Sequence, residues 1–186
     1  MSIQQIQADS KDRMHKAVEH VQSELAKVRT GRATPALLDS IKIDYYGSMT
    51  PLKQVATVSA PEPRLLVVQP YEKRLIADIE KAILQGDLGL NPNNDGNVVR
   101  IPIPELSDER RQDLLRLVKK YCEEGRVSIR NVRRDANENV KKLEKDHEVS
   151  EDNSHDAQDE IQKLTDKYIK QIDELLTHKE NELLNE

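Results

Sequence analysis

The sequence predicts an α+β protein in which an elongated three-helix bundle carries a small inserted β/α/β domain. Two observations lead to this fold class. Three stretches place apolar residues at helical spacing, at residues 3–28, 107–147 and 150–175. Short strand-like runs and turn residues separate the first stretch from the second. The bundle is therefore expected to be discontinuous, with residues 1–30 and 105–186 in one domain and residues 31–104 inserted.

The first helix has a narrow apolar seam. From Met14 to Val28 its apolar residues are separated alternately by four and three positions, as in a coiled coil. Thr30-Gly31 is expected to end this helix, because glycine favours the conformation just past a helix end and Pro35 follows shortly afterwards.

The inserted segment is predicted to hold strands around one helix. Strands are expected at residues 41–45, 55–59, 65–68 and 98–103. The first two alternate apolar and polar residues, as half-buried strands do, whereas the third is a continuous apolar run and is predicted to be buried on both faces. Residues 72–85 have helical spacing and stop at Gly86.

Two long helices follow Pro104. Ser107 and Ser150 can each cap a helix, and two acidic residues follow each serine, where they favour the helix dipole. The second helix would span roughly 60 Å at about 1.5 Å per residue. Gly125 interrupts its apolar stripe at modest cost. Because each stripe is narrow, the three helices should pack together.

Composition limits the partners and the compartment. The 186 residues have a formal net charge of -5, so any RNA binding must come from a local cluster of basic residues. Cys122 is the only cysteine, which excludes an intramolecular disulfide and favours a packing residue or a surface thiol. The first residues lack the apolar core of a secretion signal, and a cytoplasmic monomer with no membrane partner is expected.

A catalytic or metal site is not expected. None of the five histidines forms a two-His pair spaced by four, and no segment matches a nucleotide-binding P-loop. Without a nucleophile, a base or a ligand set, the sequence indicates a protein that binds without catalysing and holds no cofactor.

One cluster of charges exceeds the background. Between Glu105 and Arg134 there are nine basic and six acidic side chains. Arg126, Arg130 and Arg133 are spaced by four and three, so they share one helix face, and guanidinium groups in a row suit RNA phosphates. The alternative is a solvated face whose arginines pair with Glu123 and Glu124. Spacing alone does not separate these interpretations.

Several strings stand in order along nearly the whole chain. They are VRTGRATPALLD at 28–39, YYG at 45–47, DLGLNPN at 87–93, ERR at 109–111 and RNVRRDAN at 130–137. In these strings the chain resembles bacterial ribosome recycling factors.

The resemblance implies an L-shaped molecule that binds the 70S ribosome after termination and contacts large-subunit ribosomal RNA. It also implies that elongation factor G, which binds GTP, then drives the subunits apart and releases messenger and transfer RNA. Carried over by position, the ribosome-contacting arginines fall on Arg111, Arg130 and Arg133, with Arg29 and Arg32 as weaker candidates. Together with Arg126, these form the expected binding set.

The chain passes between the two expected domains twice. The crossings lie at Thr30-Gly31 and at Pro102, Pro104 and Glu105, and two short crossings indicate a hinge. The alternative function is a coiled-coil-like adaptor or chaperone that binds protein through its helical grooves. Salt would weaken that binding little, whereas it weakens phosphate contacts steeply. A small-molecule enzyme is the third alternative.

Overall fold

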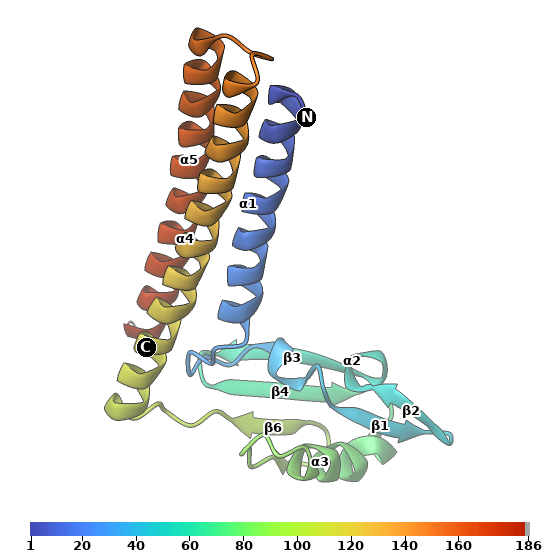
Figure 1. The fold of residues 1–186 in the computed structure, drawn as a ribbon. Coiled ribbons are helices and arrows are strands. Elements are labelled where there is room, and N and C mark those ends of the chain that lie inside the picture. Colours follow the sequence, from blue (N-terminus) through green and yellow to red (C-terminus); the bar gives the residue numbers. More distant parts are fainter. Residues whose placement is uncertain (185–186) are drawn as a thin grey trace. The chain divides into compact units, whose positions relative to one another are not determined.

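A computed structural model describes residues 1–184 and contains two compact units. One unit combines Met1–Arg29 with residues 108–184, and the other is Thr30–Ser107. The first unit is made of three long helices and the second of short strands and helices (Figure 1). The α+β fold class, a long-helix bundle with an inserted sheet domain, is confirmed.

The bundle consists of α1 (Ile3–Ala26), α4 (Asp108–Lys145) and α5 (Glu151–Leu184), which pack against one another along their lengths (Figure 1). The predicted apolar stripes form its core, and the α1 seam from Met14 to Val28 is buried at every position. Two buried hydroxyls bond within their own helices, from Ser10 to the Ile6 carbonyl and from Thr165 to the Ile161 carbonyl. The core therefore accommodates these polar groups without unmet hydrogen bonds.

Local capping sets most of the helix ends. Ser2 forms a capping box with Gln5 at the start of α1, and the Asn153 N–H donates to Ser150 Oγ at the start of α5. At the end of α4, His147 has a φ of 57°, and the Glu148 N–H reaches back to the Leu143 carbonyl. This arrangement is a Schellman-type end, in which a left-handed residue stops the helix.

The predicted end of the first helix is wrong by four residues. α1 ends at Ala26, and the next two N–H groups, of Lys27 and Val28, donate to the carbonyls three residues back. These tighter bonds close the last turn before the glycine is reached. Gly31, with a φ of 80°, lies in the chain that follows and does not cap the helix.

Side chains of α1 and α5 pack closely against Gly125 of α4. A Cβ built on this residue would lie 2.4 Å from Val21 Cγ2 on α1 and 3.0 Å from Ile172 Cδ1 on α5. From the sequence alone, Gly125 is expected to be a tolerated interruption of the apolar stripe. The structure shows that two neighbouring helices need the space that its missing side chain leaves.

The inserted unit contains a hairpin and a separate sheet. The hairpin is β1 (Lys42–Tyr45) with β2 (Ser48–Pro51). The sheet has the order β3-β4-β6-β5, with every neighbouring pair antiparallel. Its strands are β3 (Ala56–Glu62), β4 (Leu65–Pro70), β6 (Val99–Pro102) and β5 (Asn93–Asn94). The helical segments are η1 (Pro35–Leu38), α2 (Leu52–Val55), η2 (Lys73–Leu75) and α3 (Ile76–Gln85).

The core of the inserted unit lies on one side of β4. Leu66 and Val68 are fully buried with Ile79 and Ile83 of α3, whereas Leu65 is only partly buried. The prediction that this strand is buried on both faces is therefore wrong, because only alternate side chains enter the core. β2 and α2 were not predicted, and the predicted second strand begins at Ala56 rather than at Val55.

None of the helices described over residues 1–184 is both long enough and apolar enough to cross a membrane.

Candidate nucleic-acid interface

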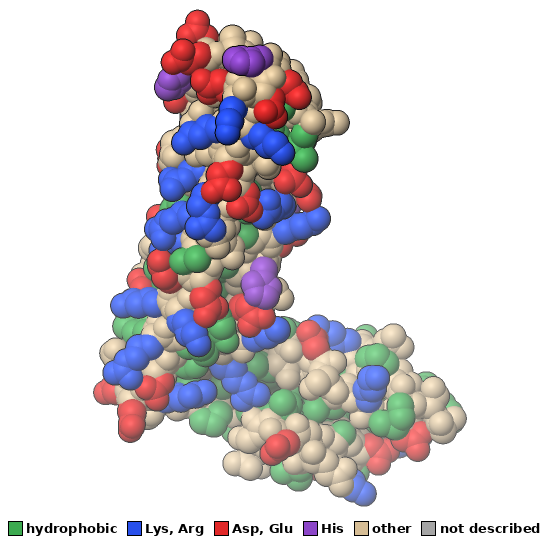
Figure 2. Space-filling model, viewed as in Figure 1, with side chains coloured by type: hydrophobic (Ala, Val, Ile, Leu, Met, Phe, Trp, Pro, Cys, Tyr) green, Lys and Arg blue, Asp and Glu red, His purple; other side chains and the backbone are tan. Residues whose placement is uncertain are grey.

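A shallow hollow lies on the surface of α4. Its volume is about 350 Å³, and it is lined by Arg130, Asn131, Arg133, Arg134, Asn137, Glu138 and Lys141. Arg130, Arg134, Asn137 and Lys141 are separated by four, three and four residues, and the other lining residues are next to them in sequence or one turn away, so a single helix face builds the hollow. In the space-filling view, Lys and Arg side chains gather on the bundle with acidic side chains between them (Figure 2).

The hollow is strongly cationic. Four of its seven side chains are basic and one, Glu138, is acidic. The Arg133 Nη1 donates to Gln162 Oε1 on α5 at 3.3 Å, which orients its guanidinium without neutralising it. Within residues 1–184, neither Arg134 nor Lys141 forms an ion pair. A partner that fits this surface carries several negative charges.

Asn137 adds a polar group to the hollow. Its Oδ1 is buried, and no donor among the described residues reaches it. Because the buried Oδ1 is out of reach of a group in the hollow, Asn137 contributes only its exposed atoms to the lining.

The other basic residues of α4 are largely offset by acids. Arg116 pairs with Asp113 at 3.1 Å, and Lys119 lies 4.0 Å from Glu180 on α5. The positive excess counted from the sequence is therefore not spread along the helix. It is concentrated in the half that contains the hollow.

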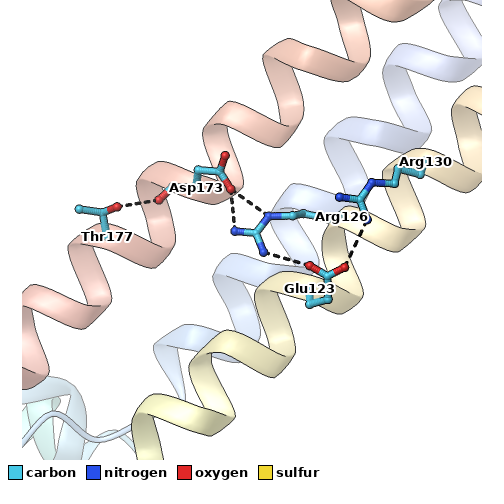
Figure 3. Close-up of polar contacts among 5 residues, drawn as sticks. All are labelled: Glu123, Arg126, Arg130, Asp173 and Thr177. Carbon is cyan, nitrogen blue, oxygen red and sulfur yellow. Dashed lines mark hydrogen bonds and ion pairs between the residues drawn. The ribbon is translucent and has the colours of Figure 1, made fainter.

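Arg126 is mostly buried and forms hydrogen bonds within the bundle. Its side chain is 17% exposed, and its Nε and Nη2 donate to Asp173 Oδ1 on α5 at 2.9 Å and 2.6 Å. Its Nη1 also donates to Glu123 Oε2 at 3.2 Å (Figure 3). All three guanidinium nitrogens are engaged, so Arg126 joins α4 to α5. Arg130 and Arg133 are more available to a partner.

Glu123 bridges two of the predicted arginines. Its Oε1 accepts from Arg130 Nη1 at 3.2 Å while its Oε2 accepts from Arg126 (Figure 3). The hydrogen bonds from Arg126 and Arg130 hold the pKa of the Glu123 carboxyl below its ordinary value. The alternative interpretation of the arginine face, pairing with nearby glutamates, thus holds for Glu123.

The remaining predicted arginines are dispersed. Arg111 is 22% exposed, donates to Asp108 at 3.2 Å, and has a buried Nε without an acceptor among the described residues. Arg29 is the last residue of the bundle's first segment, and Arg32 belongs to the inserted unit. Both are exposed. The hollow on α4 therefore contains two members of the predicted set, Arg130 and Arg133.

The predicted hinge residues differ in how firmly they are held. Pro102 pairs with Leu65 in the sheet, and the N–H of the next residue, Ile103, donates to the Arg64 carbonyl at 2.8 Å. Pro102 is therefore part of the inserted unit, whereas Pro104 follows the last sheet contact. Glu105 forms an ion pair with Arg64. On the other crossing, Thr30 begins the inserted unit and is followed by the left-handed Gly31.

Asn131, Asn137 and Lys141 line the hollow but are absent from the predicted binding set. Lys141 lies eleven residues after Arg130, which is three helical turns, so extending the same spacing would have found it. The amides give no such signal, because asparagine on a helix is usually only solvated.

The fold and the hollow define a class of binding proteins, built on a long-helix bundle with a cationic surface matched to a polyanion. Residues 21–184 match the family described as "Ribosome recycling factor". The chain belongs to the ribosome recycling factor family, whose members are translation factors without enzymatic activity of their own.

The relatives cover almost the full length of the chain. The ribosome-recycling factor of Natranaerobius thermophilus is 58% identical over 175 residues, which is 94% of this chain and 95% of that protein. The factor of Carboxydothermus hydrogenoformans is 55% identical over 98% of this chain and 99% of its own. A ribosome recycling factor solved in solution is 43% identical, with a TM-score of 0.77 over 100% of this chain and 99% of its own.

A second similar structure is described as models for the T. thermophilus ribosome recycling factor and the E. coli elongation factor G bound to the E. coli post-termination complex. That factor is 49% identical to this chain, with a TM-score of 0.66 over 99% of this chain and 100% of its own.

Proposed function

We infer that the chain acts as a ribosome recycling factor on the post-termination complex, together with elongation factor G. The family match over residues 21–184 supports this function, as does the relative that is described, together with elongation factor G, as bound to the post-termination complex. We further propose that this factor and elongation factor G, with GTP, split the 70S ribosome into subunits and release messenger and transfer RNA. GTP is bound by elongation factor G.

The cationic hollow on α4 is the main observation that supports binding to ribosomal RNA. A guanidinium group stays charged and can donate two parallel hydrogen bonds to phosphate oxygens. Arg130, Arg133 and Arg134 place three such groups within two helical turns, and Lys141 adds a fourth charge. We propose that this face grips ribosomal RNA, while Arg126 holds α4 and α5 together beneath it.

The two connections between the units supply the proposed hinge. Ala33 is anchored by a hydrogen bond from its N–H to the Pro63 carbonyl at 2.7 Å, and Ile103 is anchored through Arg64. The chain between the bundle and these anchors is short on both sides. In this proposal the bundle stays on the RNA while elongation factor G moves the inserted unit, so that force reaches the subunit interface through long, rigid helices.

Arg133→Ala tests the grip. Because a hydrogen bond to a charged group contributes about 1.5–3 kcal/mol, the variant should bind 70S ribosomes roughly 10- to 100-fold more weakly and keep its melting temperature. Light scattering of 70S ribosomes with the protein, elongation factor G and GTP should show a fall for wild type that needs all three components. When the recycling factor is at limiting concentration, the fall in light scattering should be smaller for Arg133→Ala than for wild type.

Arg116→Ala is the matched control, because Arg116 is an exposed arginine of the same helix that lies outside the hollow and pairs with Asp113. It should split ribosomes like wild type. Equal binding of ribosomes by Arg133→Ala and wild type would refute the proposed contact between this face of α4 and ribosomal RNA. Binding that hardly changes between low and high salt would favour the adaptor alternative.

A further inference from the structure

We propose that Glu123 competes with ribosomal RNA for Arg130, so that binding exchanges a carboxylate of the protein for a phosphate of the RNA. The proposal rests on the proposed function, since it requires that Arg130 contacts RNA. It assigns to Glu123 the role of a positioning residue that lowers the affinity of the cationic hollow for phosphate.

The pairing spans two helical turns. Glu123 precedes Arg130 by seven residues, and its Oε1 accepts from Arg130 Nη1 at 3.2 Å (Figure 3). Ordinary helix pairs are three or four residues apart, so both side chains must extend along the helix to meet. Arg130 therefore points from the hollow back toward Glu123, and its guanidinium has a partner before any RNA arrives.

Arg126 holds the Glu123 side chain in place. Its other oxygen accepts from Arg126 at 3.2 Å, and Arg126 is fixed to α5 by two hydrogen bonds to Asp173. An exposed glutamate is usually mobile, but this one is anchored on a guanidinium that is itself mostly buried. Asp173, Arg126 and Glu123 thus form a chain that presents one carboxylate oxygen to Arg130 (Figure 3).

The exchange is energetically easy. Glu123 and Arg130 are 55% and 47% exposed, and ion pairs this open to solvent are weak. A carboxylate and a phosphate offer a guanidinium similar oxygen geometry. When phosphate takes Arg130, Glu123 keeps its bond to Arg126, so no charge is left unpaired in the protein. Until then, one of the four charges of the hollow is offset.

Glu123→Gln is the direct test. Glutamine keeps the shape and one acceptor oxygen but removes the charge, and Arg126 keeps Asp173, so the fold should be retained. The variant should bind vacant 70S ribosomes roughly two- to fivefold more tightly at low salt. Because Arg130 contacts phosphate in both proteins, the slope of log affinity against log salt should change by clearly less than the roughly 0.7–0.9 that a whole additional phosphate contact adds.

Two further variants separate pairing from general charge. Glu124→Gln makes the same change at an exposed neighbour that has no ion pair within residues 1–184, and it should alter the affinity clearly less. In an Arg130→Gln background, Glu123→Gln should no longer strengthen binding. Equal effects at positions 123 and 124, or an undiminished effect without Arg130, would overturn the proposal.

The same measurements distinguish the two levels of failure. If Arg133→Ala weakens binding but Arg130→Gln does not, the competition is refuted while the cationic grip stands. If neither arginine variant weakens binding, the grip is refuted and the competition with it. Melting temperatures of all variants, compared with wild type, show whether a change in binding reflects a change in folding.

Discussion

Gly125 shows how one residue sets the packing of three helices. Glycine in a helix costs about 1 kcal/mol relative to alanine, and an exposed glycine would be improved by that replacement. Here the Cβ would meet Val21 on α1 and Ile172 on α5. Val21 is β-branched and fully packed, so it cannot turn aside at low cost.

Gly125→Ala should therefore destabilise the bundle. Overpacking costs about 1–3 kcal/mol, and the better helix propensity of alanine offsets only part of it. We expect a lower free energy of unfolding in urea. Ser128→Ala, at an exposed position of the same helix, should leave stability unchanged or slightly higher. An alanine at 125 that stabilised the protein would show that the helices move apart freely.

Arg126 separates a structural arginine from a binding one. Replacing it with methionine keeps the apolar stem but leaves Asp173 without its partner across the helix interface. Arg126→Met should lower the free energy of unfolding by about 0.5–1.5 kcal/mol, with little effect on ribosome affinity. A large loss of binding with unchanged stability would return Arg126 to the RNA-contacting set.

At the scale of elements, periodicity predicted the long helices well. The stripes of α4 and α5 repeat for many turns, and both begin within one residue of the predicted caps. The hairpin was harder to predict. β2 is short, has two polar residues among its four and ends at a proline, so it lacks a strand signal even though its turn contains Gly47, at a φ of 82°.

The functional site was predictable only in part, for a related reason. Spacing identified a basic face, but it could not show that Arg126 points toward α5 and is withdrawn from that face. Its direction depends on Asp173, which is 47 residues from Arg126 in sequence and adjacent only after folding. Contacts between residues that are distant in sequence cannot be predicted from the spacing of residues within one helix.

The turn between β5 and β6 predicts a pH dependence. Hydrogen bonds from the Val98 and Asn97 N–H groups, and then from Arg100, hold the pKa of Asp95 far below its ordinary value of 3.8. A lowered folded-state pKa stabilises the turn above pH 3.8, and this contribution is lost as the pH falls below that value.

Asp95→Asn should therefore reduce the stability of the inserted unit at neutral pH, and the difference from wild type should narrow in acid. NMR can follow the Asn97 and Val98 amide shifts, which should titrate with a midpoint well below pH 3.8. A midpoint at the ordinary value would show that these bonds do not favour the ionised carboxylate.

At the scale of the whole molecule, the two units are joined by two short connections. The bundle's first segment ends at Arg29, and the inserted unit begins at Thr30. Gly31, at a φ of 80°, has a conformation that proline cannot adopt. The path of this connection therefore depends on one residue.

Gly31→Pro should leave ribosome binding through the bundle near wild type and impair subunit splitting, because the first connection must take another path. Sedimentation with 70S ribosomes measures the binding, and light scattering with elongation factor G and GTP measures the splitting. Thr34→Ala, an exposed position nearby, is the control. Normal splitting by the proline variant would remove Gly31 from the hinge.

The interrupted bundle also affects how the chain is made. Residues 27–107 separate α1 from α4, so the first helix is synthesised long before either of its partners. At about 5–20 residues per second, roughly 8–30 s pass between the end of α1 and the end of α5. The core of the inserted unit lies wholly within residues 33–103 and can assemble during that delay. Until α4 emerges, the apolar seam of α1 has no partner helix, and the complete bundle core forms only once α5 has followed.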